Sequence, residues 1–193
     1  MKLDRYAQDY ALWRDSASIN YTAAKTLFET GDPFLFFPAA TLGHHALEMY
    51  LKAGLVANGM TVFNPKDLNK LDVGVNLAKA DCAWGHNLVE LAETLAQRNP
   101  AFDLSKQMDI VGYLTIKEPM TVKEGLAIFG PFFSELRYPQ EMKNCDGLGG
   151  EHKFLLDALV AELRHARFTW NNASFSVAAP KKNPRPFSLR RDG

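Results

Sequence analysis

The segment GHHALEMYLKAGL, which begins at residue 43, places two histidines, a glutamate and a lysine in an otherwise apolar run. An imidazole can transfer a proton or bind a metal, a carboxylate can do either, and an ammonium can bind an anion. At about 100° per residue, one narrow stripe of a helix carries Thr41, His45, Glu48 and Lys52, with His44 at its edge. The other positions around this stripe are nearly all apolar, which predicts a buried helix. Its polar stripe should therefore face a groove, a partner subunit or an internal polar network.

Three interpretations of this stripe are open. Glu48 precedes Lys52 by four residues, the favourable order for an ion pair within one helix, so the stripe could be purely structural with satisfied histidines. Alternatively, it could bind a ligand or face a second subunit. A metal site is a third reading, because His44 or His45 could share an ion with Glu48 and His86. Only one helix offers such ligands and the HExxH motif is absent, so we expect no metal and no cofactor.

Two further residues could act with this stripe. His86 begins a predicted helix, where free backbone N–H groups favour an anion, although it could equally pack around Trp84. Arg137 lies in the aromatic-rich segment FFSELRYP and could bind a phosphate or pair with Glu48. We therefore predict that Glu48, Lys52, His86 and Arg137 share one polar groove at or beside a dimer interface.

These residues must be positioned by helices, because apolar side chains recur at spacings of three and four along most of the chain. The predicted helix ends are marked by Gly31 with Asp32-Pro33, by Asn87 with Glu90, by Thr121 with Glu124, and by Pro131. They give the predicted helices as 4–30, 38–58, 87–99, the segment from Thr121 to Pro131, and 151–172. Residues 103–116 lean towards helix as well. No strand pair is convincing. The sequence therefore predicts an all-α fold, a single bundle of five to seven helices.

The length of 193 residues suits one domain. We expect residues 1–177 to form the bundle, with 60–85 as an insertion between main helices. Residues 178–193 are basic and contain several prolines, as is typical of a loose tail.

Composition excludes some functions. The 22 basic and 22 acidic residues give a net charge of zero, which argues against a general attraction to nucleic acid or to an anionic membrane. The opening segment is charged, and no apolar run reaches the roughly 18 residues of a membrane span, so we expect no leader and no membrane partner. Two cysteines without metal-ligand spacing predict reduced thiols in a cytoplasmic protein.

Three segments taken in order, AATLGHHALEMYLKAGLVANG, GHNLVELAETL and FFSELRYP, resemble the HEPN domain family. Residues 5–172 carry the resemblance, with 60–85 as an insertion. The resemblance implies an all-α bundle that is usually dimeric. Many members are metal-independent ribonucleases that use an Arg followed four to six residues later by His. Other members are suggested to bind nucleotides or to act as dimerising scaffolds.

That nuclease motif is absent, because no histidine of this chain has an arginine at the required distance before it. The predicted function is therefore a non-catalytic, HEPN-like homodimer that binds a nucleotide, RNA or a protein partner. Aromatic residues at the start of the chain also favour a homodimer; they are Tyr6, Tyr10, Trp13, Phe34, Phe36 and Phe37. The alternatives are a ribonuclease with a rearranged Arg/His pair, such as Arg137 with His86, and a structural dimer without a ligand.

Overall fold

The computed structural model describes the chain except residues 1–8, 63–81, 109, 111–118, 134–147 and 166–193. The described part is mostly helical: α1 (Tyr10–Glu29), α2 (Pro33–Ala57), α3 (Leu88–Arg98), α4 (Val122–Phe129), the 3₁₀ turn η4 (Gly130–Phe133) and α5 (His152–His165). The predicted all-α bundle is confirmed. The tail from 178 lies outside the described residues, as does most of the insertion. No helix in the described ranges combines the length and apolar character that a bilayer crossing requires.

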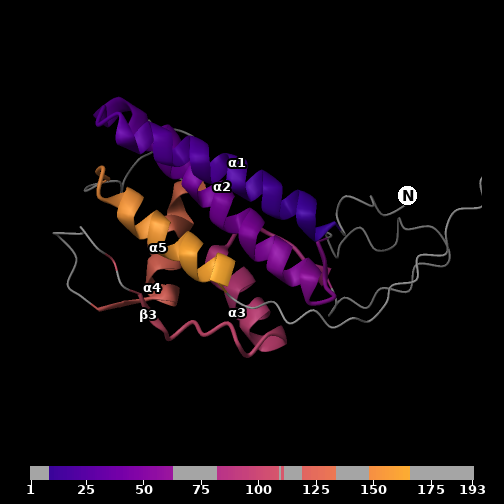
Figure 1. Ribbon diagram of the computed structural model, residues 1–193. Coiled ribbons are helices and arrows are strands. Elements are labelled where there is room, and N and C mark those ends of the chain that lie inside the picture. Colours follow the sequence, from indigo (N-terminus) through magenta and orange to yellow (C-terminus); the bar gives the residue numbers. More distant parts are fainter. Residues whose placement is uncertain (1–8, 63–81, 109, 111–118, 134–147, 166–193) are drawn as a thin grey trace, which may run out of the picture.

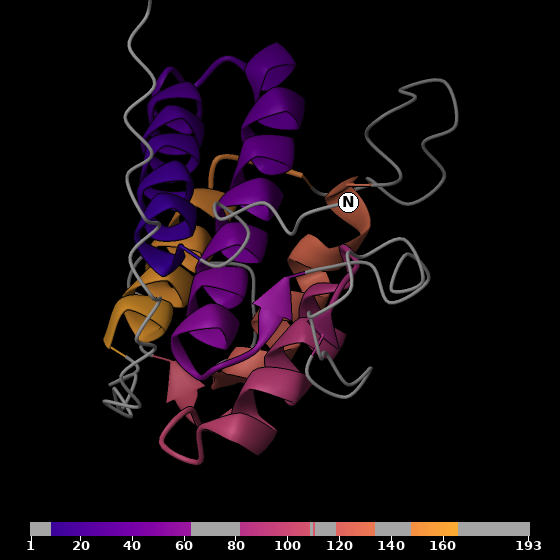
Figure 2. The same ribbon diagram turned by 90° about the vertical axis from the view of Figure 1, so that its right-hand side faces the viewer.

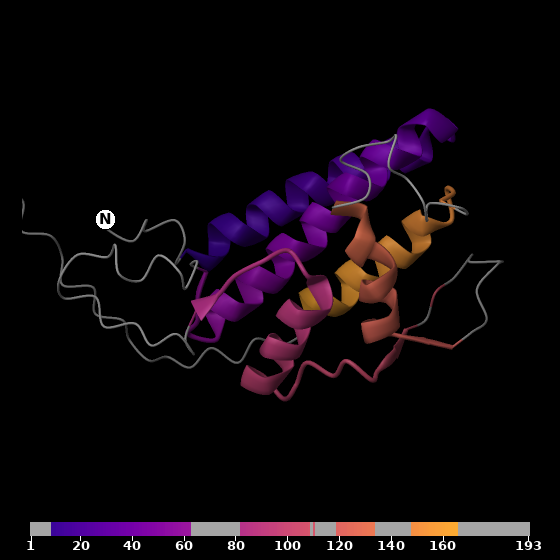
Figure 3. The ribbon, with the colours of Figure 1, turned by 180° about the vertical axis from the view of Figure 1, so that it is seen from behind.

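Helix α2 is the centre of the bundle. Figures 1 and 3 show α1 and α2 as a long antiparallel pair, with α5 packed along it and with α3 and α4 beyond. Figure 2, viewed from the side, shows α1 and α2 as neighbouring columns. Helix α2 contacts all four other α-helices and η4. Its side chains Leu47, Leu51 and Leu55 are fully buried, as expected for a helix that is apolar nearly all round.

The start of α2 differs from the prediction. We expected it at Pro38, but the helix begins five residues earlier at Pro33, and Pro38 lies inside it. Asp32 is the N-cap, its carboxylate accepting the Phe34 N–H at 3.0 Å, and Pro33 occupies the first helical position, where its missing N–H costs nothing. Pro38 removes only one backbone hydrogen bond, which this heavily buried helix tolerates.

The predicted caps are largely confirmed. Gly31, with φ of 70°, follows the end of α1, and Asn87 is the N-cap of α3, accepting from Val89 and Glu90 N–H. Thr121 and Glu124 form a complete capping box at the start of α4. Helix α4 then ends at Phe129, before Pro131, which lies in η4. These local signals fixed where each helix that carries the site begins.

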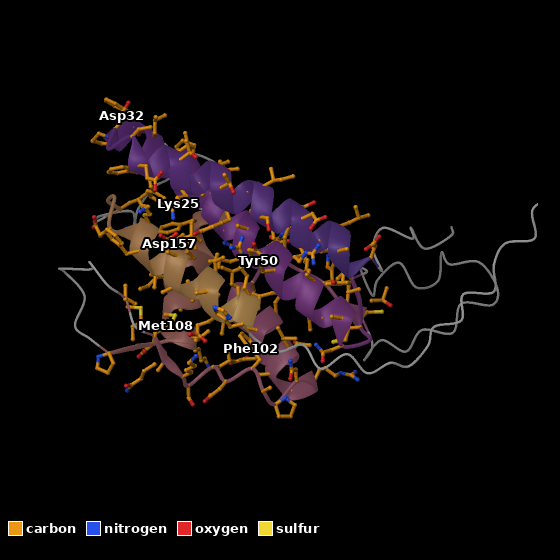
Figure 4. The ribbon with its side chains drawn as sticks, viewed as in Figure 1. Lys25, Asp32, Tyr50, Phe102, Met108 and Asp157 are labelled. Atoms are coloured by element: carbon orange, nitrogen blue, oxygen red, sulfur yellow. The ribbon has the colours of Figure 1, made fainter. Side chains whose placement is uncertain are left out.

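The helical expectation for 103–116 is wrong where the structure describes it. Strand β3 (Gln107–Met108) pairs antiparallel with β4 (Met120–Thr121). The carboxylate of Asp103 accepts the Ser105 N–H at 2.8 Å, a turn that competes with a helix start. Phe102 and Met108 are buried in the core below α5 (Figure 4). Residues 111–118 of the expected helix lie outside the described residues.

A second short pair closes the insertion. Strand β1 (Thr61–Val62) follows α2 directly and pairs parallel with β2 (Cys82–Ala83), so that Thr61 lies opposite Cys82. The chain therefore returns to the end of α2 just before α3 begins. This return positions the candidate site.

Candidate functional site

Four consecutive residues, Trp84 to Asn87, form the turn that faces α2. The β1–β2 pair brings this turn back to α2, and Gly85 adopts φ of 116°, a conformation that an L-residue with a Cβ rarely takes. The two side chains that flank Gly85 both contact polar residues of α2, while Asn87 caps α3. The WGHN sequence therefore places an indole and an imidazole against the same helix, α2.

The carboxylate of Glu48 is the centre of the site. It is only 5% exposed, yet four basic groups surround it. Lys52 Nζ donates to Oε1 at 2.5 Å, and His86 Nδ1 lies 3.0 Å from Oε2. His44 Nε2 and His45 Nδ1 lie 3.7 Å and 4.0 Å from Oε2. We call His44, Glu48, Lys52 and His86 the Glu48 cluster.

These neighbours keep Glu48 ionised. Burial alone would raise its pKa, because a low-dielectric interior disfavours a charge. The contacts with His44, Lys52 and His86, and the positive charge of Lys52, outweigh burial and lower the pKa of Glu48 from 4.5 to about 2. Because an ionised carboxylate only accepts hydrogen bonds, His86 must donate its Nδ1–H to it. The remaining ring nitrogen of His86, Nε2, is then the acceptor in the neutral imidazole.

His44 is buried beside Glu48, and a hydrogen bond fixes its ring. Its Nδ1–H donates to the Phe129 carbonyl at 2.9 Å, because a carbonyl can only accept. The adjacent Gly43 permits this close approach of α4, since a Cβ there would lie 3.0 Å from the Phe129 ring. His44 is fully buried, and its Nε2 has no hydrogen-bond partner among the described residues. The Glu48 carboxylate lies 3.7 Å from that nitrogen, so His44 is the second, buried imidazole of the cluster.

Phe133 of η4 joins the imidazoles together. The His86 ring stacks on Phe133 with centroids 4.3 Å apart, and the His44 ring stacks on it at 5.4 Å. His45 meets the same ring edge-on at 5.2 Å. The break at Pro131 that ends α4 is therefore what brings Phe133 over the cluster.

His86 reaches a cleft. Its side chain is 48% exposed, although one nitrogen and one ring face are engaged. The cleft has a volume of about 560 Å³ and is lined by His86, Asn87, Val89, Ala127, Gly130, Pro131 and Phe133. Apolar walls with a few polar groups at one end are typical of small-molecule sites. His86 is thus the group through which buried Glu48 can act on anything in the cleft.

Lys52 lies between two indoles. Its ammonium is 5.6 Å from the Trp13 ring centroid on α1 and 5.5 Å from that of Trp84. Such cation–π contacts, together with the Glu48 ion pair, compensate for burying the ammonium. Trp84 is itself 54% exposed, so an aromatic surface borders the turn that carries His86.

Three of the four residues expected to share a groove are together, because Lys52 and His86 both contact Glu48. Arg137, the fourth, lies outside the described residues. The Glu48–Lys52 ion pair expected in the structural interpretation is also present. The same side chains therefore serve both the structural interpretation and the ligand-binding one. Among the described residues, no group of three or more His, Cys, Asp or Glu side chains is arranged to hold a metal ion.

Sequence reasoning missed Phe133. Its only local signal is the aromatic pair after Pro131, which indicates a helix break but not a contact with residues 44 and 86. The sequence predicts Trp84 as a packing partner of His86, whereas the residue is 54% exposed.

The chain matches no family model, no curated protein and no solved structure at a significant level. The HEPN resemblance therefore stays a prediction, and the function must be argued from the site.

Proposed function

We propose that this chain is a non-catalytic, HEPN-like binding module whose cleft takes the base of a nucleotide, either free or in RNA. The observation that carries the proposal is His86, which is held by Glu48 and Phe133 and yet is half exposed at the cleft. A planar, nitrogen-bearing base suits such a place, because apolar walls hold its faces and an imidazole meets its polar edge. Exposed Trp84 beside His86 offers a further stacking surface.

Fixing His86 in advance matters for affinity. A side chain that is already hydrogen-bonded and stacked loses little further freedom when a ligand binds. The anionic group of the ligand should stay away from Glu48, since two negative charges in a buried site repel each other. We therefore expect recognition of the base in the cleft, with the phosphate towards solvent or towards Arg137.

A panel of ribonucleoside monophosphates in a thermal-shift assay tests the proposal. A ligand at about 100 times its Kd should add about 2.7 kcal/mol of stability, which for a chain of this size raises Tm by about 5–10 °C. We expect His86→Ala to abolish the shift and His165→Ala, an exposed histidine at the end of α5, to leave it unchanged. If no nucleotide raises Tm, nucleotide binding is excluded and a structural dimer without a ligand becomes the better proposal.

One observation favours the ribonuclease as a second candidate. A carboxylate that accepts the Nδ1–H of a histidine is the arrangement that orients an imidazole for general base catalysis. The partner would be Arg137. Digestion of a labelled RNA that is lost in His86→Ala and in Arg137→Ala would support this candidate, and intact RNA under those conditions would exclude it.

A further inference from the structure

A second cationic centre lies on the seam between α1, α2 and α5. Arg164, in the last turn of α5, donates its Nε–H to the Tyr50 hydroxyl oxygen at 2.8 Å. Its guanidinium carbon also lies 5.1 Å from the Tyr21 ring centroid and 5.4 Å from that of Tyr50. Although Arg164 is an exposed residue, its guanidinium is held by two aromatic rings and one hydrogen bond.

The group that orients Arg164 is itself fixed. Tyr50 is 3% exposed, and its hydroxyl lies 2.9 Å from Ser18 Oγ on α1. The phenol therefore links all three helices, and its oxygen cannot turn away from the guanidinium without breaking this link. A helix C-terminus favours any nearby cation, but that effect needs only charge and no orientation. The helix dipole therefore does not explain why the guanidinium of Arg164 is held in one orientation.

The carboxylate that α5 contributes to the seam, Asp157, is already paired. Asp157 accepts the Tyr21 hydroxyl at 2.7 Å and the Lys25 ammonium at 3.4 Å, and Lys153 lies 3.9 Å away. Figure 4 shows Lys25 and Asp157 together on the seam, with Tyr50 further along it. Burial and then the hydrogen bond to Asp157 raise the pKa of Tyr21, so its hydroxyl remains a donor to that carboxylate.

Among the described residues, Arg164 has no counter-ion. Five charged side chains converge on the seam: Lys25, Lys153, Arg164, Glu29 and Asp157. The three cations exceed the two carboxylates by one charge, and among the residues that the structure describes no carboxylate lies within ion-pairing distance of Arg164. Its two terminal nitrogens, a fork that matches an oxyanion, have no hydrogen-bond partner in that part of the chain.

We propose that Arg164, held by Tyr50 and Tyr21, is a preformed binding residue for a single oxyanion group, a phosphate or a carboxylate. The fork can bind two oxygens of either group at once, and one unpaired positive charge suits one negative charge. This site is independent of the cleft at His86, and it uses none of the Glu48 cluster.

The arginine Nε–H signals of the ¹⁵N-labelled full chain test this proposal. Inorganic phosphate, acetate and chloride are titrated separately at constant ionic strength. We expect a saturable shift of the Arg164 signal with phosphate or acetate, the stronger of the two identifying the group, and none with chloride. Arg14 is the matched control, because it also lies over a tyrosine but is paired with Asp15 at 2.9 Å. Arg164 and Arg14 signals that move alike without saturation would overturn the proposal.

Variants separate orientation from charge, with ³¹P line width as the readout for phosphate. Tyr50→Phe keeps the ring and removes the oxygen, so affinity should fall about tenfold while the helical circular dichroism stays unchanged. Arg164→Lys keeps the charge and loses the fork, so saturable binding should disappear, whereas Arg14→Lys should bind as the unmodified chain does. Equal affinity in Tyr50→Phe would contradict a preformed site, and retained affinity in Arg164→Lys would contradict recognition by the guanidinium.

Discussion

Glu48 is a buried carboxylate with more basic neighbours than its single charge needs. Lys52 alone balances that charge, yet His86 donates a hydrogen bond to the same carboxylate and His44 lies beside it. Replacing both members of a buried ion pair by apolar residues is often neutral, because desolvation offsets attraction, whereas removing one member leaves an uncompensated charge. The extra imidazoles suggest that the carboxylate also serves to orient His86.

The depressed pKa of Glu48 predicts how stability depends on pH. Because the folded pKa, about 2, lies below the ordinary 4.5, the ionised carboxylate stabilises the fold above pH 4.5. This contribution, on the order of 3 kcal/mol, is lost as pH falls from about 4.5 to about 2. Glu48→Gln should therefore be less stable than the unmodified chain at pH 7 by about this amount. The difference should shrink at low pH, as measured by urea unfolding at several pH values.

Glu93→Gln is the control for that prediction. Glu93 pairs with Lys123 at 2.7 Å on the surface, where an ion pair contributes about 0–1 kcal/mol. Its substitution should change the free energy of unfolding by no more than that at any pH. A Glu48→Gln variant with the same small, pH-independent effect would show that the Glu48 cluster does not stabilise the charge.

At the scale of elements, the turn from Trp84 to Asn87 determines where His86 and Trp84 lie relative to α2. Gly85→Ala should destabilise the protein by about 1–3 kcal/mol, because φ of 116° strains any residue with a Cβ. The strain should be relieved by moving His86, so the variant should also lose part of any nucleotide-induced thermal shift.

Gly130→Ala is the matched control for Gly85→Ala. Gly130 has helical φ of −52°, and no atom lies within 4 Å of the Cβ that alanine would add. This change should be neutral or stabilising by about 0.4–1 kcal/mol in thermal or urea unfolding. If the two alanine variants had equal stability, the turn would not depend on the conformation of Gly85.

Local signals predicted the elements better than their contacts. The caps at Asn87 and Thr121 follow from side chains within three residues, so they were readable, and the buried stripe of α2 follows from periodicity alone. Pro38 indicates a helix start, but Asp32 and Pro33 supply the N-cap and the first helical position five residues earlier, so the predicted start of α2 is wrong. The β1–β2 pair and the stacking of Phe133 on His86 join residues far apart in the chain, and no local pattern encodes them.

At the scale of the whole molecule, the expected homodimer stays a prediction. Phe36 and Phe37 pack partly against the core, so they need no second subunit. Phe34, at 87% exposure, and Ile19, at 71%, remain as large apolar side chains in water. Burying such groups against a second copy would be favourable. Light scattering at micromolar concentration should give about twice the mass of one chain, 21.6 kDa, and a monomeric mass would contradict the dimer.

In the proposed function, His86 is oriented by Glu48 and contacts a nucleobase in the cleft. Long-range ¹H–¹⁵N correlations of the histidine rings test it directly, because they report which nitrogen carries the proton and whether a ligand touches the other. We predict that His86 carries its proton on Nδ1 and that its Nε2 signal shifts saturably with at least one ribonucleoside monophosphate, while His165 does not respond. A His86 ring that is protonated on Nε2 alone, or that no nucleotide perturbs, would contradict nucleobase binding by an oriented His86.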